Sequence, residues 1–247
     1  MKNTRETNFL KNNIIAHRGV YNLKKDNIPE NSIEAFKNAI DNNYMIELDL
    51  HVLKDDNVVV FHDKNLHRMT GIDKDIKDCT YDEIKNLKLI NTDNHIPLFK
   101  DVLELVDGKV PLLIELKHDV KVGKLEKETM KYLKKYKGEY AIMSFNPLTL
   151  LYFKKEYSNI IRGQLAYDLN DKKFNFIKRY ILENMSFNFI TKPDFIAYGI
   201  DSMPSKVVEK FRKKGLVIGW TVKNEKDLEI AKKYCDNYIF EDENKRD

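Results

Sequence analysis

Ile46–Asp63, IELDLHVLKDDNVVVFHD, is the stretch from which the fold of this chain follows. It begins as a strand, in which successive side chains alternate between two faces. Glu47 and Asp49 therefore share one face. Two carboxylates this close repel each other, so the pair needs a metal cation, an Arg or Lys side chain, or solvent. The chain turns at Lys54–Asn57 and returns as an apolar run ending on His62, so the hairpin indicates metal-assisted acid–base chemistry.

Strand and helix patterns alternate about eight times along the chain, with short connections. Short apolar runs predict strands, and apolar residues at helical spacing predict helices. Besides the strand at Ile46, the expected strands are Asn13–Ala16, Val110–Ile114, Tyr140–Phe145, Ile160–Ala166, Phe195–Ile200, Leu216–Val222 and Tyr238–Phe240. The expected helices are Ile33–Asn42, Leu98–Val106, Lys124–Tyr136, Asn146–Tyr157, Lys172–Asn184, Lys206–Lys214 and Glu225–Tyr234.

This alternation predicts parallel strands joined by crossover helices. Eight such units in 247 residues fit a (β/α)8 TIM barrel, so we expect one barrel domain over residues 1–247. The alternative is an open doubly wound sheet, which requires a glycine-rich phosphate loop after the first strand. Gly19 is a single glycine at that place, which favours the barrel.

The composition indicates a protein with a full apolar core and a surface of mixed charge. There are 43 basic and 39 acidic residues, and the Lys-rich helices lack the motifs of a nucleic-acid site. Residues 1–13 lack the apolar core of a signal peptide, and no apolar run is long enough to span a bilayer. Cys79 and Cys235 form no CxxC motif, which favours a reducing compartment. We therefore expect a cytoplasmic protein without stable membrane insertion.

Ionisable residues gather at the carboxyl ends of the expected strands, where TIM barrels place their active sites. Glu115 ends the third strand and adds a third carboxylate to the two acids of the hairpin. Three carboxylates without a cysteine indicate a hard cation, Mg²⁺ or Ca²⁺, whereas histidine ligands would indicate zinc instead.

The same ends of the strands carry residues that suit a phosphate diester. Arg18 and Lys117 are natural phosphate partners, one as a planar fork and the other as a point charge. His17 and His62 can divide two proton transfers between them, and a metal would polarise the phosphoryl oxygens. Trp220, near the end of the seventh strand, either forms an apolar wall for the leaving group or plugs the barrel mouth. These parts predict metal-assisted cleavage of a phosphate diester.

Five short motifs follow one another along the chain. They are His17-Arg18-Gly19, Pro29-Glu30-Asn31-Ser32, Glu47-Leu48-Asp49, His62-Asp63 with Leu66, Arg68 and Thr70, and Glu115-Leu116-Lys117. Their order resembles that of the glycerophosphodiester phosphodiesterase family, and the resemblance covers about residues 14–240. It implies a TIM barrel with a small insertion after strand two, at about Lys64–Ile96.

The resemblance also implies a role for each site residue and a small-molecule substrate. Glycerophosphodiesters would be hydrolysed to sn-glycerol 3-phosphate and an alcohol. The implied roles are divalent-cation binding for Glu47, Asp49 and Glu115, acid–base catalysis for His17 and His62, and phosphate contact for Arg18 and Lys117. The resemblance leaves open the leaving alcohol, the metal, the order of the two histidines, the first nucleophile (water or the glycerol hydroxyl) and the oligomeric state.

Some features keep more than one interpretation. Asn31 either lines the site or caps the next helix. Arg18 pairs either with phosphate or with a structural acid such as Glu30. His51 lies on the acidic face, either behind the site or at the surface. Lys223 interrupts the WTVN sequence that the family often shows, which leaves the substrate rim undecided.

Two rival functions follow from the same residues. A lysophospholipase D-like enzyme would act on lipid headgroups, and an exposed apolar patch on the insertion would favour it. A non-catalytic barrel would only bind a phosphodiester, but the presence of both histidines and all three acids argues against it.

Overall fold

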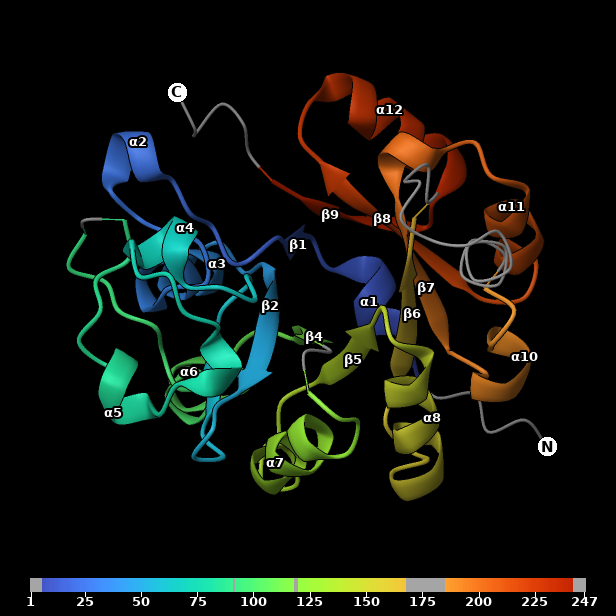
Figure 1. The fold of residues 1–247 in the computed structure, drawn as a ribbon. Coiled ribbons are helices and arrows are strands. Elements are labelled where there is room, and N and C mark those ends of the chain that lie inside the picture. Colours follow the sequence, from blue (N-terminus) through green and yellow to red (C-terminus); the bar gives the residue numbers. More distant parts are fainter. Residues whose placement is uncertain (1–5, 91, 118–119, 168–184, 242–247) are drawn as a thin grey trace. The chain divides into compact units, whose positions relative to one another are not determined.

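The computed structural model describes residues 6–90, 92–117, 120–167 and 185–241. It divides into two compact units (Figure 1). Among the described residues, the larger unit contains those from 15 to 140, and the smaller unit contains those from 6 to 14 and from 141 to 241. The expected helix Lys172–Asn184 lies outside the described residues.

The larger unit is built on strand β2 (Met45–Val52), whose eight residues are all buried. β1 (Ile15–Ala16) and β4 (Leu112–Leu116) both pair with β2 in parallel. β3 (Val58–Val60) pairs with β2 in antiparallel register, which confirms the predicted hairpin. Because β2 is buried on both faces, its acidic side chains lie inside the protein.

Some helices of the larger unit begin where the sequence supplies a side-chain cap. The Ser32 side chain accepts a hydrogen bond from the backbone N–H of Ala35 and so caps α3. Thr80 and Glu83 form a capping box at the start of a one-turn helix. The helices are α2 (Leu23–Asp26), α3 (Ile33–Asp41), α4 (His67–Thr70), α5 (Tyr81–Ile84), α6 (Phe99–Val106) and α7 (Lys124–Leu133).

The segment 64–96, predicted as an insertion, has a small apolar core of its own. Leu66, Met69, Ile76 and Ile84 are buried together with residues of the β2–β3 hairpin. A short 3₁₀ helix, η1 (Ile76–Asp78), lies between α4 and α5. The segment is therefore fixed to the hairpin that carries the acids.

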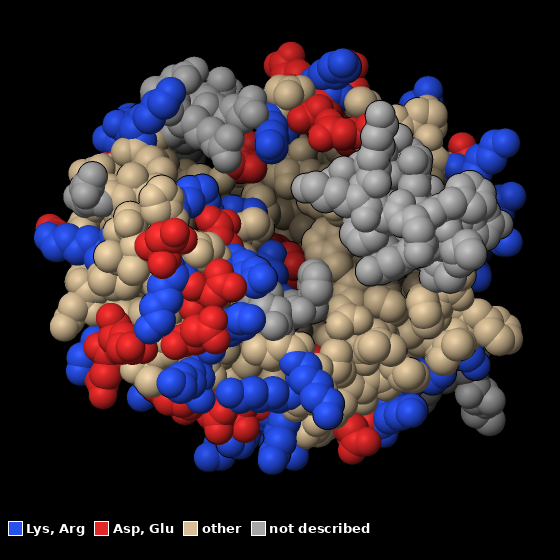
Figure 2. Space-filling model, viewed as in Figure 1, with Lys and Arg blue, Asp and Glu red and all other residues tan. Residues whose placement is uncertain are grey.

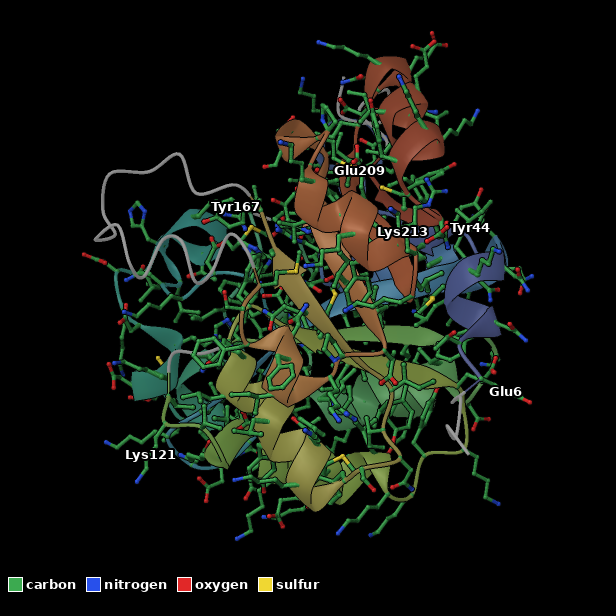
Figure 3. All side chains as sticks on the ribbon, turned by 90° about the vertical axis from the view of Figure 1, so that its right-hand side faces the viewer. Glu6, Tyr44, Lys121, Tyr167, Glu209 and Lys213 are labelled. Carbon is green, nitrogen blue, oxygen red and sulfur yellow. The ribbon has the colours of Figure 1, made fainter. Side chains whose placement is uncertain are left out.

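The smaller unit contains five consecutive parallel strands and the helices that connect them. The strands are β5 (Tyr140–Ser144), β6 (Arg162–Ala166), β7 (Phe195–Gly199), β8 (Leu216–Val222) and β9 (Asn237–Phe240). The helices are α1 (Asn8–Asn12), α8 (Pro147–Glu156), α10 (Asn188–Thr191), α11 (Lys206–Arg212) and α12 (Glu225–Tyr234), and η2 (Ile200–Ser202) is a 3₁₀ turn. Glu209 on α11 and Lys213 just after it are exposed (Figure 3), whereas Val208 and Phe211 of the same helix are buried.

Eight parallel strands, joined by helical crossovers, form a (β/α)8 barrel with β3 as one extra antiparallel strand. This confirms the predicted fold class. The expected elements are present within the described residues, although β1 is shorter than the strand expected at 13–16. The short helices α1, α2 and α10 were not expected, since helices of four or five residues carry little periodicity.

The described surface carries charges of both signs. Figure 2 shows Lys and Arg side chains interspersed with Asp and Glu side chains over the face in view. None of the helices in the described ranges combines the length and the apolar character that crossing a bilayer requires.

Candidate active site

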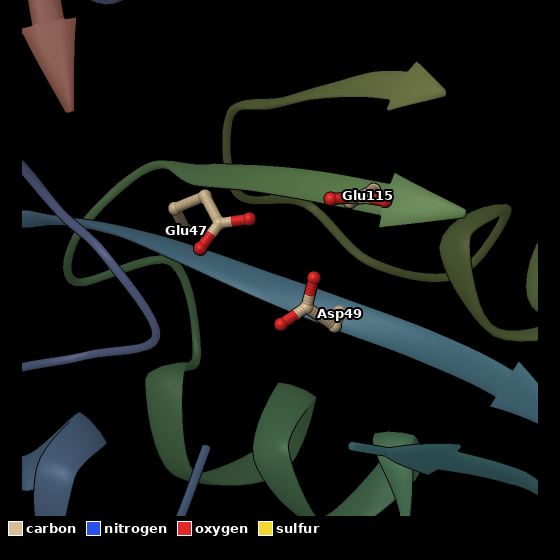
Figure 4. A group of neighbouring side chains, drawn as sticks. All are labelled: Glu47, Asp49 and Glu115. Carbon is tan, nitrogen blue, oxygen red and sulfur yellow. The ribbon is translucent and has the colours of Figure 1, made fainter. Parts of the chain in front are cut away.

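Three carboxylates converge in the larger unit (Figure 4). Glu47 and Asp49 project from β2, and Glu115 projects from β4, where it stands directly opposite Asp49 in the parallel register. One oxygen from each carboxylate lies within 4.8 Å of the other two. All three side chains are buried, as expected for residues inside a barrel.

Two basic side chains pair with this acid cluster. The Lys117 ammonium Nζ lies 2.8 Å from both Asp49 Oδ1 and Glu115 Oε1. The Arg18 backbone N–H donates to Glu47 Oε2 at 3.0 Å, and the Arg18 guanidinium Nε lies 3.4 Å from Asp49 Oδ2. The two residues expected to contact phosphate are therefore held beside the acids.

Burial and mutual repulsion act differently on the three carboxyl groups. Burial raises the pKa of Glu47 well above its usual value, and the charges of Asp49 and Glu115 raise it further. For Asp49 the effect of burial is outweighed by Lys117 and Arg18, so its pKa lies well below the usual value. Burial also raises the pKa of Glu115, against the effect of Lys117. The cluster thus favours an added positive charge, either a proton or a cation.

The donor set fits a hard divalent cation. Within the described ranges, the one group of neighbouring metal-binding side chains consists of Glu47, Asp49 and Glu115, all oxygen donors. Oxygen donors suit Mg²⁺ and Ca²⁺, whereas zinc sites are usually built with histidine or cysteine.

His17 and Arg18 stand on a sharply turned backbone directly after β1. Arg18 has φ 55° and Gly19 has φ 79°, both in the left-handed region. A Cβ on Gly19 would lie 2.8 Å from the Ala35 carbonyl, so only glycine fits there. Burial lowers the pKa of His17 well below its usual value, and the neighbouring Arg18 charge lowers it further. His17 is therefore neutral near pH 7.

His62 belongs to a chain of charged hydrogen bonds. Its Nδ1 lies 2.7 Å from Asp63 Oδ1. The Arg68 guanidinium donates from Nη2 to Asp63 Oδ1 at 3.0 Å and to Glu30 Oε1 at 2.6 Å. Glu30 Oε1 also accepts from Arg18 Nη1 at 2.7 Å. Arg68, on α4 of the insertion, thereby links the region of His62 to that of Arg18.

The structure bears on two questions that the sequence left open, the partner of Arg18 and the position of His51. The pair Arg18–Glu30 is present, as one interpretation of Arg18 predicted. His51 is buried, and its Nε2 lies 3.2 Å from the carbonyl oxygen of His62, so it lies behind the site and not at the surface. The sequence analysis included Arg68 in the His62-Asp63 motif but did not predict that it bridges Asp63 and Glu30.

Arg68→Met tests the ion pairs of Arg68 through the pH dependence of stability. Asp63 and Glu30 both have lowered pKa values. Burial alone would raise both pKa values, but hydrogen bonds outweigh the effect of burial. Asp63 receives these hydrogen bonds from His62 and Arg68, and Glu30 receives one from Arg68. A carboxyl group whose pKa is lowered in the folded state stabilises the fold at pH values above its unfolded-state pKa of about 4. This contribution is lost progressively as the pH falls from that value toward the folded-state pKa. Arg68 is half exposed, so we expect a loss of only about 1 kcal/mol at pH 7.

The measurement is thermal unfolding of both proteins from pH 7 to pH 3. The wild type should lose more stability than Arg68→Met over this range, so that the two melting temperatures converge. Parallel curves would contradict the role given to Arg68.

Trp220 lies in the smaller unit, in an aromatic cluster. Its ring centroid is 5.6 Å from that of Phe145 and 6.1 Å from that of Tyr167, both edge-on. Tyr167, labelled in Figure 3, directly follows β6 and is exposed. The indole Nε1 of Trp220 is buried and has no hydrogen-bond partner within the described chain. Phe145 and Trp220 thus form part of one apolar surface.

Known proteins resemble the chain over nearly its whole length. The sequence model of the glycerophosphoryl diester phosphodiesterase family matches residues 17–243. A glycerophosphodiester phosphodiesterase of Caldanaerobacter subterraneus is 30% identical over 94% of this chain and 95% of its own length. A human lysophospholipase D is 34% identical, but over 51% of this chain and 42% of its own length.

A solved structure gives independent support for the fold. The Oleispira antarctica phosphodiesterase, solved in complex with the product sn-glycerol-3-phosphate, superposes with a TM-score of 0.78. The match covers 94% of this chain and 93% of that chain, at 20% sequence identity. From the family match and the relative that is similar over its full length, it follows that this chain belongs to the glycerophosphoryl diester phosphodiesterase family and is a phosphoric diester hydrolase of that type.

Proposed function

We propose that the protein hydrolyses glycerophosphodiesters to sn-glycerol 3-phosphate and an alcohol, with a divalent cation and two histidines. The observation that carries the proposal is the buried group of Glu47, Asp49 and Glu115, whose ligand oxygens lie within 4.8 Å of one another. The charge of His62 acts on both Asp49 and Glu115, so a histidine belongs to the same electrostatic environment. The product bound in the Oleispira antarctica structure, sn-glycerol-3-phosphate, is consistent with this substrate class.

In the proposed mechanism His17 is the general base. It is neutral near pH 7 because burial and the charge of Arg18 lower its pKa, so it can accept the proton of an attacking hydroxyl. His62 is the general acid. Its Nδ1 is held by Asp63, which orients the ring and leaves Nε2 to donate a proton to the leaving alcohol.

Arg18 and Lys117 position the phosphate in this mechanism. Both are already fixed by carboxylates, Arg18 by Glu30 and Lys117 by Asp49 and Glu115, so neither loses much side-chain freedom on binding an anion. A cation held by Glu47, Asp49 and Glu115 would polarise the phosphoryl oxygens and offset charge that develops on them. We assign Mg²⁺ or Ca²⁺ to this role because the donors are all oxygens.

Trp220 completes the proposal as the residue that contacts the substrate's leaving group. Its support is the apolar surface that it forms with Phe145 and Tyr167. A reducing, cytoplasmic environment is also proposed, since Cys79 and Cys235 are both buried free thiols.

The lipid-headgroup alternative would be favoured by an exposed apolar patch on the insertion, and the described part of the insertion has none. Within the described part of segment 64–96, Ile72 is the one large hydrophobic side chain that is exposed. A single exposed apolar residue is common on soluble proteins and does not form a patch.

The test is release of glycerol 3-phosphate by the purified protein, with and without a chelator. We expect glycerophosphocholine and glycerophosphoethanolamine to be hydrolysed, and we expect the chelator to abolish the activity, with recovery when Mg²⁺ or Ca²⁺ is added. Lysophosphatidylcholine is assayed in parallel, and its preferential cleavage would favour the lipid alternative. Full activity in chelator would contradict the role of the cation. Phosphorus NMR during turnover identifies the first nucleophile, because attack by the glycerol hydroxyl produces a cyclic phosphate.

A further inference from the structure

Asn31 is a buried residue with an acceptor oxygen that has no hydrogen-bond partner in the described part of the chain. The residue is only 2% exposed. Its Nδ2 donates to Asp49 Oδ2 at 2.8 Å, whereas its Oδ1 is buried and unpaired. A buried carbonyl oxygen without a hydrogen-bond partner destabilises the fold, so this oxygen is suited to receive a ligand.

The position of the Asn31 Oδ1 atom follows from the hydrogen bond that Asn31 Nδ2 donates to Asp49. Turning the amide around would place Oδ1 against the Asp49 carboxylate, and two acceptors repel each other, so the orientation is fixed. Oδ1 is two covalent bonds from Nδ2, which places it roughly 5 Å or less from Asp49 Oδ2. The unpaired oxygen therefore lies beside the acid cluster.

Helix capping does not account for the Asn31 side chain. The cap of α3 is Ser32, whose Oγ accepts from Ala35 N–H at 3.2 Å and donates to the Pro29 carbonyl at 2.7 Å. Asn31 itself has φ 53°, and its backbone N–H donates to the Arg18 carbonyl at 3.0 Å. This fixes the residue to the loop that also carries His17 and leaves the amide free for another role.

We propose that Asn31 belongs to the cation site, with Nδ2 orienting the Asp49 carboxylate and Oδ1 acting as a further, neutral oxygen ligand. The inference rests on the cation site of the proposed function. Amide oxygens are common ligands of Ca²⁺, and a neutral ligand adds coordination without adding charge to three carboxylates that already repel one another. A group that orients a ligand also contributes to metal affinity.

The test is direct calorimetric titration of Mg²⁺ and Ca²⁺ into the metal-stripped full-length protein. Asn31→Ala removes both contacts, and we expect its cation affinity to fall 10- to 100-fold. Ser32→Ala is the matched control: it removes the neighbouring cap, which should lower the melting temperature while the cation affinity stays at the wild-type value. Asn31→Asp keeps a ligand oxygen but loses the donor to Asp49, and it should bind more tightly than Asn31→Ala.

Each contrary result has a distinct meaning. Wild-type affinity in Asn31→Ala overturns the inference, and the proposed function then stands if the wild type binds the cation and releases glycerol 3-phosphate. Equal weakening in Asn31→Asp and Asn31→Ala overturns the ligand role of Oδ1. A wild type that binds neither ion at millimolar concentration overturns the cation site itself, together with this inference.

Discussion

His17→Ala and His62→Ala should each lower kcat by about 10²- to 10⁴-fold, the usual contribution of a positioned acid or base. Both side chains lie outside the group of carboxylates, so the fold and the cation affinity should change little. The assay is glycerol 3-phosphate release at saturating substrate, with calorimetric titration of the cation in parallel. His95→Ala is the matched control, since His95 is an exposed histidine of the same unit, and it should retain full activity.

The pH profile distinguishes the proposed base from a merely structural histidine. Because burial and Arg18 lower the pKa of His17, it stays neutral and competent as a base below its usual pKa of about 6.5. The acidic limb of kcat/KM should therefore fall below pH 6.5 in the wild type. If either alanine variant keeps near-wild-type kcat, the assignment of the two histidines is wrong.

Lys117→Met should be the most destabilising substitution at the site. Nζ of this side chain, which is only 12% exposed, bridges Asp49 and Glu115 at 2.8 Å, and the substitution leaves buried carboxylates without their partner. Breaking a buried ion pair in this way costs about 3–5 kcal/mol. A divalent cation can replace the lost charge, so millimolar Mg²⁺ or Ca²⁺ should restore part of the stability.

Urea unfolding with and without the cation measures both effects. Lys85→Met is the control, because Lys85 forms an exposed pair with Asp82 and its loss should change the stability little. A cost for Lys117→Met as small as that of Lys85→Met would show that the acid cluster does not depend on Lys117.

The sequence predicted the barrel well because each strand and helix carries its own periodic signal. It also predicted that Glu47 and Asp49 share a face, since alternation along a strand is fixed by geometry. The placement of Glu115 opposite Asp49 needed the register between β2 and β4, which depends on tertiary packing.

What the sequence could not predict depends on contacts between distant residues. Arg68 and Glu30 are 38 positions apart in the sequence, and the sequence around either residue does not predict their hydrogen bond. Asn31 had two interpretations because both Asn31 and Ser32 are good helix caps, and only the contact of Ser32 with Ala35 decides between them. The position of Trp220 among aromatic rings likewise depends on neighbours from other strands.

Because Arg68 contacts both Asp63 and Glu30, the parts of segment 64–96 differ in how well they should tolerate substitution. Leu66 and Met69 anchor α4 in the small core, and Arg68 between them contacts the residues beside His62. The outer turns of the segment, which include exposed Ile72 and His95, do not contact Asp63 or Glu30 among the described residues. An engineer could therefore exchange the outer turns without breaking these ion pairs, provided that the inner helical turn around Arg68 is kept.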